Sequence, residues 1–138
     1  MSNEMNRDVT SFYVHQAKFL GLAPAAQATT EIKIESDSDF FVYKLAYTAD
    51  LAAAGQTDSS RVIPLITVLI TDGGSDRQLM RAPIPVPSIF GTGQIPFILP
   101  DPHRFKASST ISIAVTNYDA ANTYNLYLDL IGFKKFVR

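Results

Sequence analysis

The residues best suited to acid–base or metal chemistry are the two histidines, His15 and His103. Neither has a partner at the spacing of a metal-binding pair such as His-x-His or His-x-x-x-His. Asp101 lies two residues before His103 and could place a carboxylate beside the imidazole, but surface loops contain such neighbours routinely. The Gly-x-Ser-x-Gly pattern that presents a nucleophilic serine does not occur. We therefore expect no catalytic residues and no enzyme activity.

Metal and phosphate sites are equally poorly supported. The sequence has no cysteine, which excludes disulfides, thiolate zinc sites and iron–sulfur clusters. Acidic clusters at 35–39 and 72–76 offer the hard oxygen ligands that calcium prefers, but neither matches an EF-hand loop and both lie where turns are needed. The Gly-Thr-Gly at 91–93 resembles part of a phosphate-binding loop, yet no Gly-Lys-Ser/Thr follows it. We expect no metal and no cofactor.

Composition narrows the range of partners. The chain has 138 residues, the length of one domain, and a formal net charge of −1, so it lacks the basic excess that neutralises nucleic-acid phosphates. Charged residues make up only 18%, below the roughly 25% usual in soluble domains, which favours a surface partly covered by a neighbour. The N-terminus is polar, unlike a signal peptide, and the longest apolar run, 62–70, is too short to span a membrane. We expect neither nucleic acid nor membrane as a partner.

The elements that position these residues are predicted to be strands. Short segments with alternating apolar and polar residues are separated by proline, glycine and small polar residues, a pattern typical of a sandwich or barrel. The expected strands cover 29–35, 40–47, 61–71, 76–82, 109–117 and 123–133, with a helical turn at 50–54. The proline-rich stretch 82–100 is expected to be extended, at a sheet edge or in a long loop. The pattern predicts an all-β fold, an antiparallel β-sandwich of jelly-roll type with seven or eight strands.

The domain is expected to cover 13–138, preceded by an extended N-terminal arm at 1–12 that has no strand pattern. The strand at 40–47 carries an aromatic face, for which alternation selects Phe41, Tyr43, Leu45 and Tyr47. The aromatic residues Phe40, Phe41, Tyr43 and Tyr47 could stack on sugars, although the sequence has no tryptophan, the residue best suited to that role. Because the face includes a leucine, we favour a core position for it and keep a carbohydrate-binding module as an alternative.

The segment 61–71 departs from the pattern of a two-layer sandwich. One face would carry Val62, Ile66, Val68 and Ile70, and the other would carry Ile63, Leu65 and Leu69. Large aliphatic side chains on the outer face would form an adhesive patch unless something covers them. The cover could be the arm, the chain's own loops or another subunit. Pro64 interrupts the backbone ladder, which places this strand near an edge or a bulge.

Three segments carry a resemblance to a known family. Residues 87–100 read Pro-Ser-Ile-Phe-Gly-Thr-Gly-Gln-Ile-Pro-Phe-Ile-Leu-Pro, a strand ends in Val-Thr-Asn-Tyr at 115–118, and the chain closes on Gly-Phe-Lys-Lys-Phe at 132–136. Over about 30–138 the chain resembles small virion proteins of tailed bacteriophages and is similar to their jelly-roll cement, or capsid decoration, proteins. The resemblance implies a non-enzymatic protein, dimeric, made in the host cytoplasm and placed on the outer capsid surface of the virion. There it would bridge neighbouring major capsid protein subunits.

We expect the contacts with capsid or partner to come from the arm, the segment 61–71, the proline-rich loop and the C-terminal end. The residues concerned are Phe12, Tyr13, Ile63, Leu65, Leu69, Pro85, Pro87, Phe90, Gln94, Phe97, Lys134, Lys135, Phe136 and Arg138. Basic residues near the end would pair with an acidic surface, and such binding weakens in salt. A tail or neck component of the virion is a further alternative.

Overall fold

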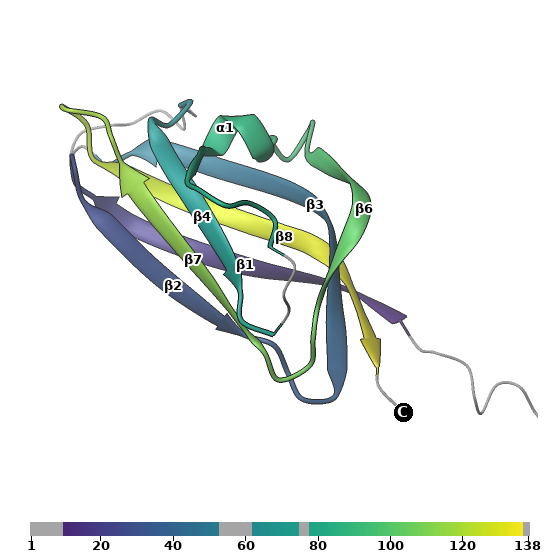
Figure 1. Cartoon of the computed structure of the whole chain (residues 1–138). Helices are drawn as coiled ribbons and strands as arrows, with labels where there is room; N and C mark the ends of the chain where they lie inside the picture. Colours follow the sequence, from purple (N-terminus) through teal and green to yellow (C-terminus); the bar gives the residue numbers. More distant parts are fainter. Residues whose placement is uncertain (1–9, 53–61, 75–77, 137–138) are drawn as a thin grey trace, which may run out of the picture.

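The chain folds into two facing antiparallel sheets (Figure 1). This computed structural model describes residues 10–52, 62–74 and 78–136. Sheet A has the order β1-β8-β3-β6 and sheet B the order β2-β7-β4-β5. The elements are β1 (Thr10–Leu22), β2 (Gln27–Lys33), β3 (Ser38–Leu51), β4 (Ile66–Asp72), β5 (Ile84–Pro85), α1 (Val86–Ile89), β6 (Phe97–Phe105), β7 (Thr110–Asn117) and β8 (Tyr124–Phe136).

This strand order is that of a jelly roll, which confirms the predicted fold class. Every connection except the one from β4 to β5 crosses from one sheet to the other, and the last strand returns to pair with the first. The two four-stranded sheets therefore share one core between them. Its largest fully buried side chains come from both sheets: Phe40, Leu45, Phe105, Leu126, Leu128 and Leu130 from sheet A, with Ile66, Ile70, Ile111 and Ile113 from sheet B.

The strands predicted at 29–35, 109–117 and 123–133 correspond to β2, β7 and β8. In β8 the residues at 124, 126, 128 and 130 are buried and those between them face outward, as alternation requires. The proline-rich stretch ends in β6, which is extended and forms one edge of sheet A, as expected. This position suits Pro100 and Pro102, because an edge strand need not donate hydrogen bonds on its free side.

The predicted face of the 40–47 strand is only half right, because β3 contains a bulge. The register of β3 with both neighbours shifts between Val42 and Lys44. An extra residue reverses the alternation, so Leu45 points into the core whereas Phe41 and Tyr43 lie on the outer side of sheet A. Gly132 of β8 lies opposite, and a Cβ atom there would overlap the carbonyl oxygen of Phe41. A glycine at 132 therefore leaves room for the bulge.

The segment 61–71 is not one two-faced strand. β4 begins at Ile66, after a non-strand segment in which Pro64 is buried, and its inner face of Ile66, Val68 and Ile70 is fully buried as predicted. Ile63 and Leu65 precede the strand and are exposed, so only Leu69 remains as a large apolar side chain on its outer face. A proline cannot donate to the ladder, and the strand starts only after it.

Three further expectations are corrected. The return strand at 76–82 does not form over 78–82, and the two-residue β5 and the long β7 pair with β4 instead. Residues 50 and 51 belong to β3 rather than to a helical turn, and the described residues contain one helix, α1, in the proline-rich stretch. Thr10, Ser11 and Phe12 begin β1, because their backbones pair with the end of β8. The rest of the arm, 1–9, lies outside the described residues.

Candidate protein-docking face

The outer side of sheet A carries apolar side chains in two adjacent rows that run across its strands. In the first row Phe12 of β1 lies opposite Phe133 of β8, which lies opposite Phe41 of β3. In the second row the pairing continues through all four strands, in the order Val14, Ile131, Lys44 and Ile98. Tyr43, in the bulge, lies beside Phe133. We call Phe12, Val14, Phe41, Tyr43, Ile98, Ile131 and Phe133 the outer apolar face.

These side chains are accessible to a partner. Phe12 is 67% exposed and Ile98 is 62% exposed, at the two opposite edges of sheet A. Between them the aromatic rings pack on one another: the centroids of Phe41 and Phe133 lie 5.2 Å apart with nearly parallel planes, and Tyr43 lies 6.2 Å from Phe133. Stacked rings have fewer free rotamers to lose, so such a surface binds at a small cost in side-chain entropy.

Charged and amide groups border the outer apolar face and are partly paired within the chain. The guanidinium Nε of Arg104 donates to Asp39 at 2.9 Å, and the amide of Gln16 donates to Asp129 at 2.8 Å. Lys44 lies within the second row, between Ile131 and Ile98, and its ammonium is 5.4 Å from the ring of Tyr43. The arrangement, an apolar centre with a polar rim, is typical of surfaces that bind other proteins.

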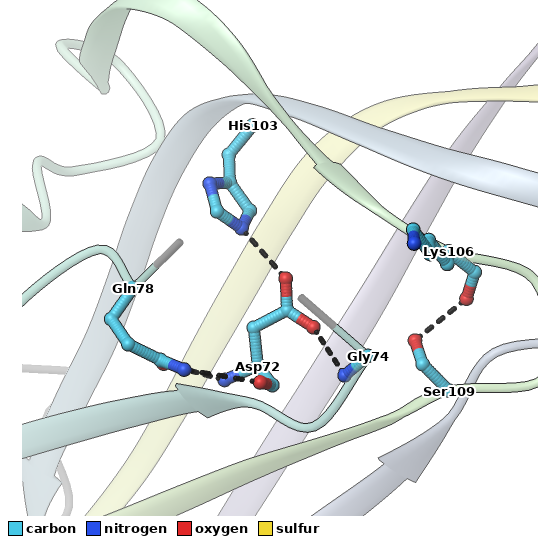
Figure 2. A network of polar contacts seen from close by, with 6 residues as sticks. All are labelled: Asp72, Gly74, Gln78, His103, Lys106 and Ser109. Carbon is cyan, nitrogen blue, oxygen red and sulfur yellow. Dashed lines mark hydrogen bonds and ion pairs between the residues drawn. The ribbon is translucent and has the colours of Figure 1, made fainter. Parts of the chain in front are cut away.

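The acidic turn at 72–74 belongs to a polar network that links the two sheets (Figure 2). The Nε2 atom of His103 lies 3.0 Å from Oδ2 of Asp72, and the other oxygen of Asp72 accepts the backbone N–H of Gly74. The side-chain amide of Gln78 forms two hydrogen bonds with the backbone of Asp72: it accepts one from the N–H and donates one to the carbonyl. His103 therefore pairs with Asp72 from the other sheet, not with Asp101, its neighbour in the sequence.

His15 lies at one end of the sandwich, inside an aromatic cluster. Its ring centroid is 4.7 Å from that of Tyr13 and 4.6 Å from that of Phe40. Lys134 places its ammonium 3.9 Å from the ring of Tyr13 and donates to the carboxylate of Glu35. Burial and the nearby charge of Lys134 lower the pKa of His15, with Glu35 opposing, and the hydrogen bond to Glu35 raises the pKa of Lys134. The cluster closes this end of the core.

The connection from β7 to β8 is held by a third polar group. Asp119 accepts the hydroxyl of Tyr124 at 2.7 Å, the side chain of Asn122 at 2.9 Å and the backbone N–H of Ala121 at 2.8 Å. These hydrogen bonds, that of Tyr124 first, lower the pKa of Asp119 to about 2. Asn117 adds bonds to the carbonyls of Leu22 and Asn122. The side chains of Asn117 and Asp119 thus form hydrogen bonds with the turn and with the end of β1, so their role is structural.

The structure places the predicted contact residues in several regions. Phe12, Tyr13, Lys134, Lys135 and Phe136 lie at the paired ends of β1 and β8. Ile63 and Leu65 lie before β4, Leu69 lies on the outer side of sheet B, and Pro85 and Pro87 are exposed at β5 and α1. Gln94 is exposed in the loop before β6, Phe97 begins β6, and Arg138 lies outside the described residues.

Not all of these residues can contact a partner in this conformation. Phe90 is only 1% exposed and lies in the core, so its side chain has no surface to offer. The side chain of Lys134 is engaged with Glu35 and Tyr13. Phe12 alone among the predicted contact residues belongs to the outer apolar face. Phe41 and Tyr43 were considered only for a sugar-binding face, and the sequence pattern did not single out Val14, Ile98, Ile131 or Phe133. Ile131 and Phe133 carry a signal in the sequence: they continue the outward side of β8, on which the polar residues Asn125, Tyr127 and Asp129 also lie.

The described parts of the chain contain no group of three or more His, Cys, Asp or Glu side chains arranged to hold a metal ion. Within the same residues, no helix combines the length and hydropathy needed to cross a membrane. The chain matches no known protein family, no curated protein and no solved structure. The proposed function rests on the outer apolar face, whose residues come from all four strands of sheet A.

Proposed function

We propose that this protein is a non-catalytic structural protein that docks onto another protein through the outer apolar face. The observation that carries the proposal is the position of seven large apolar side chains in adjacent rows on the outside of a four-stranded sheet. An antiparallel sheet that faces water normally presents polar residues there. Contiguous apolar surface of this kind marks protein-binding sites.

The finer proposal is that the partner is the major capsid protein of a tailed bacteriophage and that the protein cements neighbouring subunits on the outside of the virion. The jelly-roll fold is compatible with this role, and the resemblance of segments 87–100, 115–118 and 132–136 supports it. A rigid scaffold with little net charge suits a clamp on a protein shell. Many identical weak contacts on one shell add through avidity, so no single dominant contact is required.

Binding to shells tests this proposal. Phage heads prepared without the protein are mixed with the purified chain and pelleted, and the bound copies are counted by quantitative mass spectrometry. We expect co-sedimentation that saturates at a copy number comparable to that of the capsid protein. Saturation at a dozen copies or fewer would instead identify a tail or neck component. Failure to co-sediment at any concentration would refute docking on the head.

A carbohydrate-binding module is the second candidate, favoured by one observation. Phe41, Tyr43 and Phe133 form a group of three aromatic rings on the outer side of sheet A, bordered by Lys44 and Arg104, which could bond sugar hydroxyls. Because the chain has no tryptophan, binding can be followed by tyrosine fluorescence across a panel of glycans. Saturable quenching that Tyr43→Ala abolishes would support this candidate, and a flat response in the wild type would remove it.

A further inference from the structure

The four edges of the two sheets differ in how they are protected against pairing with another chain. An edge strand leaves a row of backbone N–H and C=O groups unpaired, and proteins usually protect it with proline, charge or short length. β6 contains Pro100 and Pro102, and β5 has only two residues. β2 carries Glu31 and Lys33 among its exposed residues. These three edges are thus protected by prolines, by short length or by charges of both signs.

β1, the other edge of sheet A, carries only one such protective charge, that of Lys18. It runs for 13 residues without a proline or an acidic residue, and Lys18 is its only lysine or arginine. Its register with β8 is unbroken from Thr10 to Phe19, so the free edge is regular over ten residues. Among the described strands only β8 pairs with it. Of the ten large hydrophobic side chains that are exposed among the described residues, four lie on this one strand: Phe12, Tyr13, Val14 and Leu20.

We propose that β1 pairs antiparallel with β1 of a second copy of this chain, which joins the two sheets A into one continuous eight-stranded sheet. The unpaired backbone groups of both edges are satisfied at once, and the exposed apolar side chains along β1 are covered by their counterparts. There are two alternatives: the edge could pair with a strand of another protein, or it could stay exposed to solvent. Both are possible outcomes of the mass measurement described below.

Side-chain alternation limits the register of this pair. Residues that lie opposite one another in an antiparallel pair point to the same side of the sheet, so the two-fold axis must pass through a residue position. If the axis passes through Val14 or through His15, the two strands pair over almost the whole regular segment from Thr10 to Phe19. With either centre Lys18 lies opposite Thr10 or Phe12 of the second copy, not opposite the second Lys18. The pair therefore places no like charges against each other.

Pairing through β1 would also affect how the protein docks, a consequence that rests on the proposed function. The two-fold axis is perpendicular to the sheet, so the outer apolar faces of both copies point to the same side. Two docking surfaces are then presented side by side on one rigid sheet. A dimer that engages two sites of a repeating shell gains affinity by avidity without any new contact.

The mass of the protein in solution tests the pairing. We expect light scattering after gel filtration to give twice the 15.2 kDa of one chain at micromolar concentration. The double variant Val14→Lys/Gln16→Lys places lysines against each other in both registers, and its dimer dissociation constant should rise at least about tenfold. The control Ile98→Lys/Thr48→Lys adds the same two charges to the outer side of sheet A away from β1 and should remain dimeric. A wild type that is monomeric at every concentration, or equal loss in both variants, overturns the proposal.

Cysteine cross-linking gives an independent readout, because the natural chain has no cysteine. Residues opposite one another in an antiparallel pair have Cα atoms about 4.5–5.5 Å apart, within the range of a disulfide. Val14→Cys/Gln16→Cys should form a covalent dimer under mild oxidation with either register, whereas Ile98→Cys should not. Cross-linking of Ile98→Cys as fast as the double variant would contradict pairing through β1.

The outcomes separate this proposal from the proposed function. Ile98→Lys/Thr48→Lys should stay dimeric while losing affinity for shells, because it changes the outer apolar face and not the β1 edge. A protein that dimerises through β1 but binds no shell refutes only the docking role. A protein that binds shells as a monomer, with no cross-link at β1, refutes only the pairing.

Discussion

His103 of β6 and Asp72 of β4 join the two sheets through a contact of 3.0 Å between Nε2 and Oδ2. The side chain of Asp72 is 1% exposed and that of His103 is 11% exposed, so water replaces little of this contact. β6 is the edge strand that contributes Ile98 to the outer apolar face. The contact therefore anchors a strand of the proposed docking surface to the opposite sheet.

Removing the imidazole should destabilise the fold. In His103→Ala the buried oxygen of Asp72 loses its partner, and a buried polar group left unsatisfied costs about 1–3 kcal/mol. Urea denaturation followed by circular dichroism measures the free energy of unfolding. The matched control is Ser109→Ala, which removes an exposed hydroxyl bonded to the carbonyl of Lys106 in the adjacent turn and should change stability by less than about 0.5 kcal/mol. Equal effects of the two substitutions would show that the inter-sheet contact adds nothing.

The bulge in β3 depends on the glycine opposite it. We expect Gly132→Ala to cost about 3 kcal/mol or more, because the added methyl group would overlap the backbone carbonyl of Phe41, which cannot rotate away. Gly93→Ala is the control, since a Cβ atom there has no neighbour within 4 Å. Chemical denaturation of both variants measures the difference. A Gly132→Ala protein as stable as Gly93→Ala would mean that β3 does not bulge against β8.

His15 should make stability depend on pH near neutrality. Its folded-state pKa lies below its usual value because burial and the charge of Lys134 disfavour the imidazolium. The unfolded chain therefore binds a proton at this imidazole more readily than the folded chain does. The stabilising contribution of His15 is present above about pH 6.5 and is lost as the pH falls through the lowered folded-state pKa. Unfolding free energies measured from pH 8 to pH 5 should fall, and His15→Gln should remove part of that fall. An unchanged slope in the variant would contradict the environment described for His15.

The hydrogen-bonded carboxylate of Asp119 should cause a second loss of stability at acid pH. Its pKa is lowered to about 2 by its hydrogen bonds, that of Tyr124 first, so the folded state holds this carboxylate charged where the unfolded chain protonates it. The contribution is present above the ordinary aspartate pKa of 3.8 and is lost as the pH falls from about 4 to about 2. Asp119→Asn should flatten the stability curve in that interval. The exposed Asp101→Asn is the control, and an equal flattening by both variants would exclude a specific role for the 119 network.

The parts of the fold that the sequence predicts are those with one apolar and one polar face. β7 and β8 alternate clearly because their even or odd positions face the core and the others face outward. β1 escaped prediction because both of its sides are apolar: Phe19 points inward while Phe12 and Val14 point outward. A strand whose outer side is apolar loses the contrast on which alternation depends.

The remaining differences arise from contacts that are distant in the sequence. The bulge in β3 moves Phe41 and Tyr43 to the outer side, and the glycine that permits it lies in β8. His103 pairs with Asp72, 31 residues away, although Asp101 is closer in the chain. β4 starts at Ile66 because its ladder with β7 begins there. The outer apolar face itself combines residues from four strands, so only the sheet order could assemble it.

The docking claim is tested most directly by two charge variants on opposite faces of the sandwich. Ile98→Lys places a charge on the outer apolar face, and Thr71→Lys places the same charge on the exposed outer side of sheet B. Both are titrated, with the wild type, against phage shells prepared without the protein, and the bound fraction is measured by co-sedimentation. We predict that Thr71→Lys binds as the wild type does and that Ile98→Lys binds at least about tenfold more weakly. Equal binding of all three proteins, or loss of binding in Thr71→Lys alone, would contradict docking through sheet A.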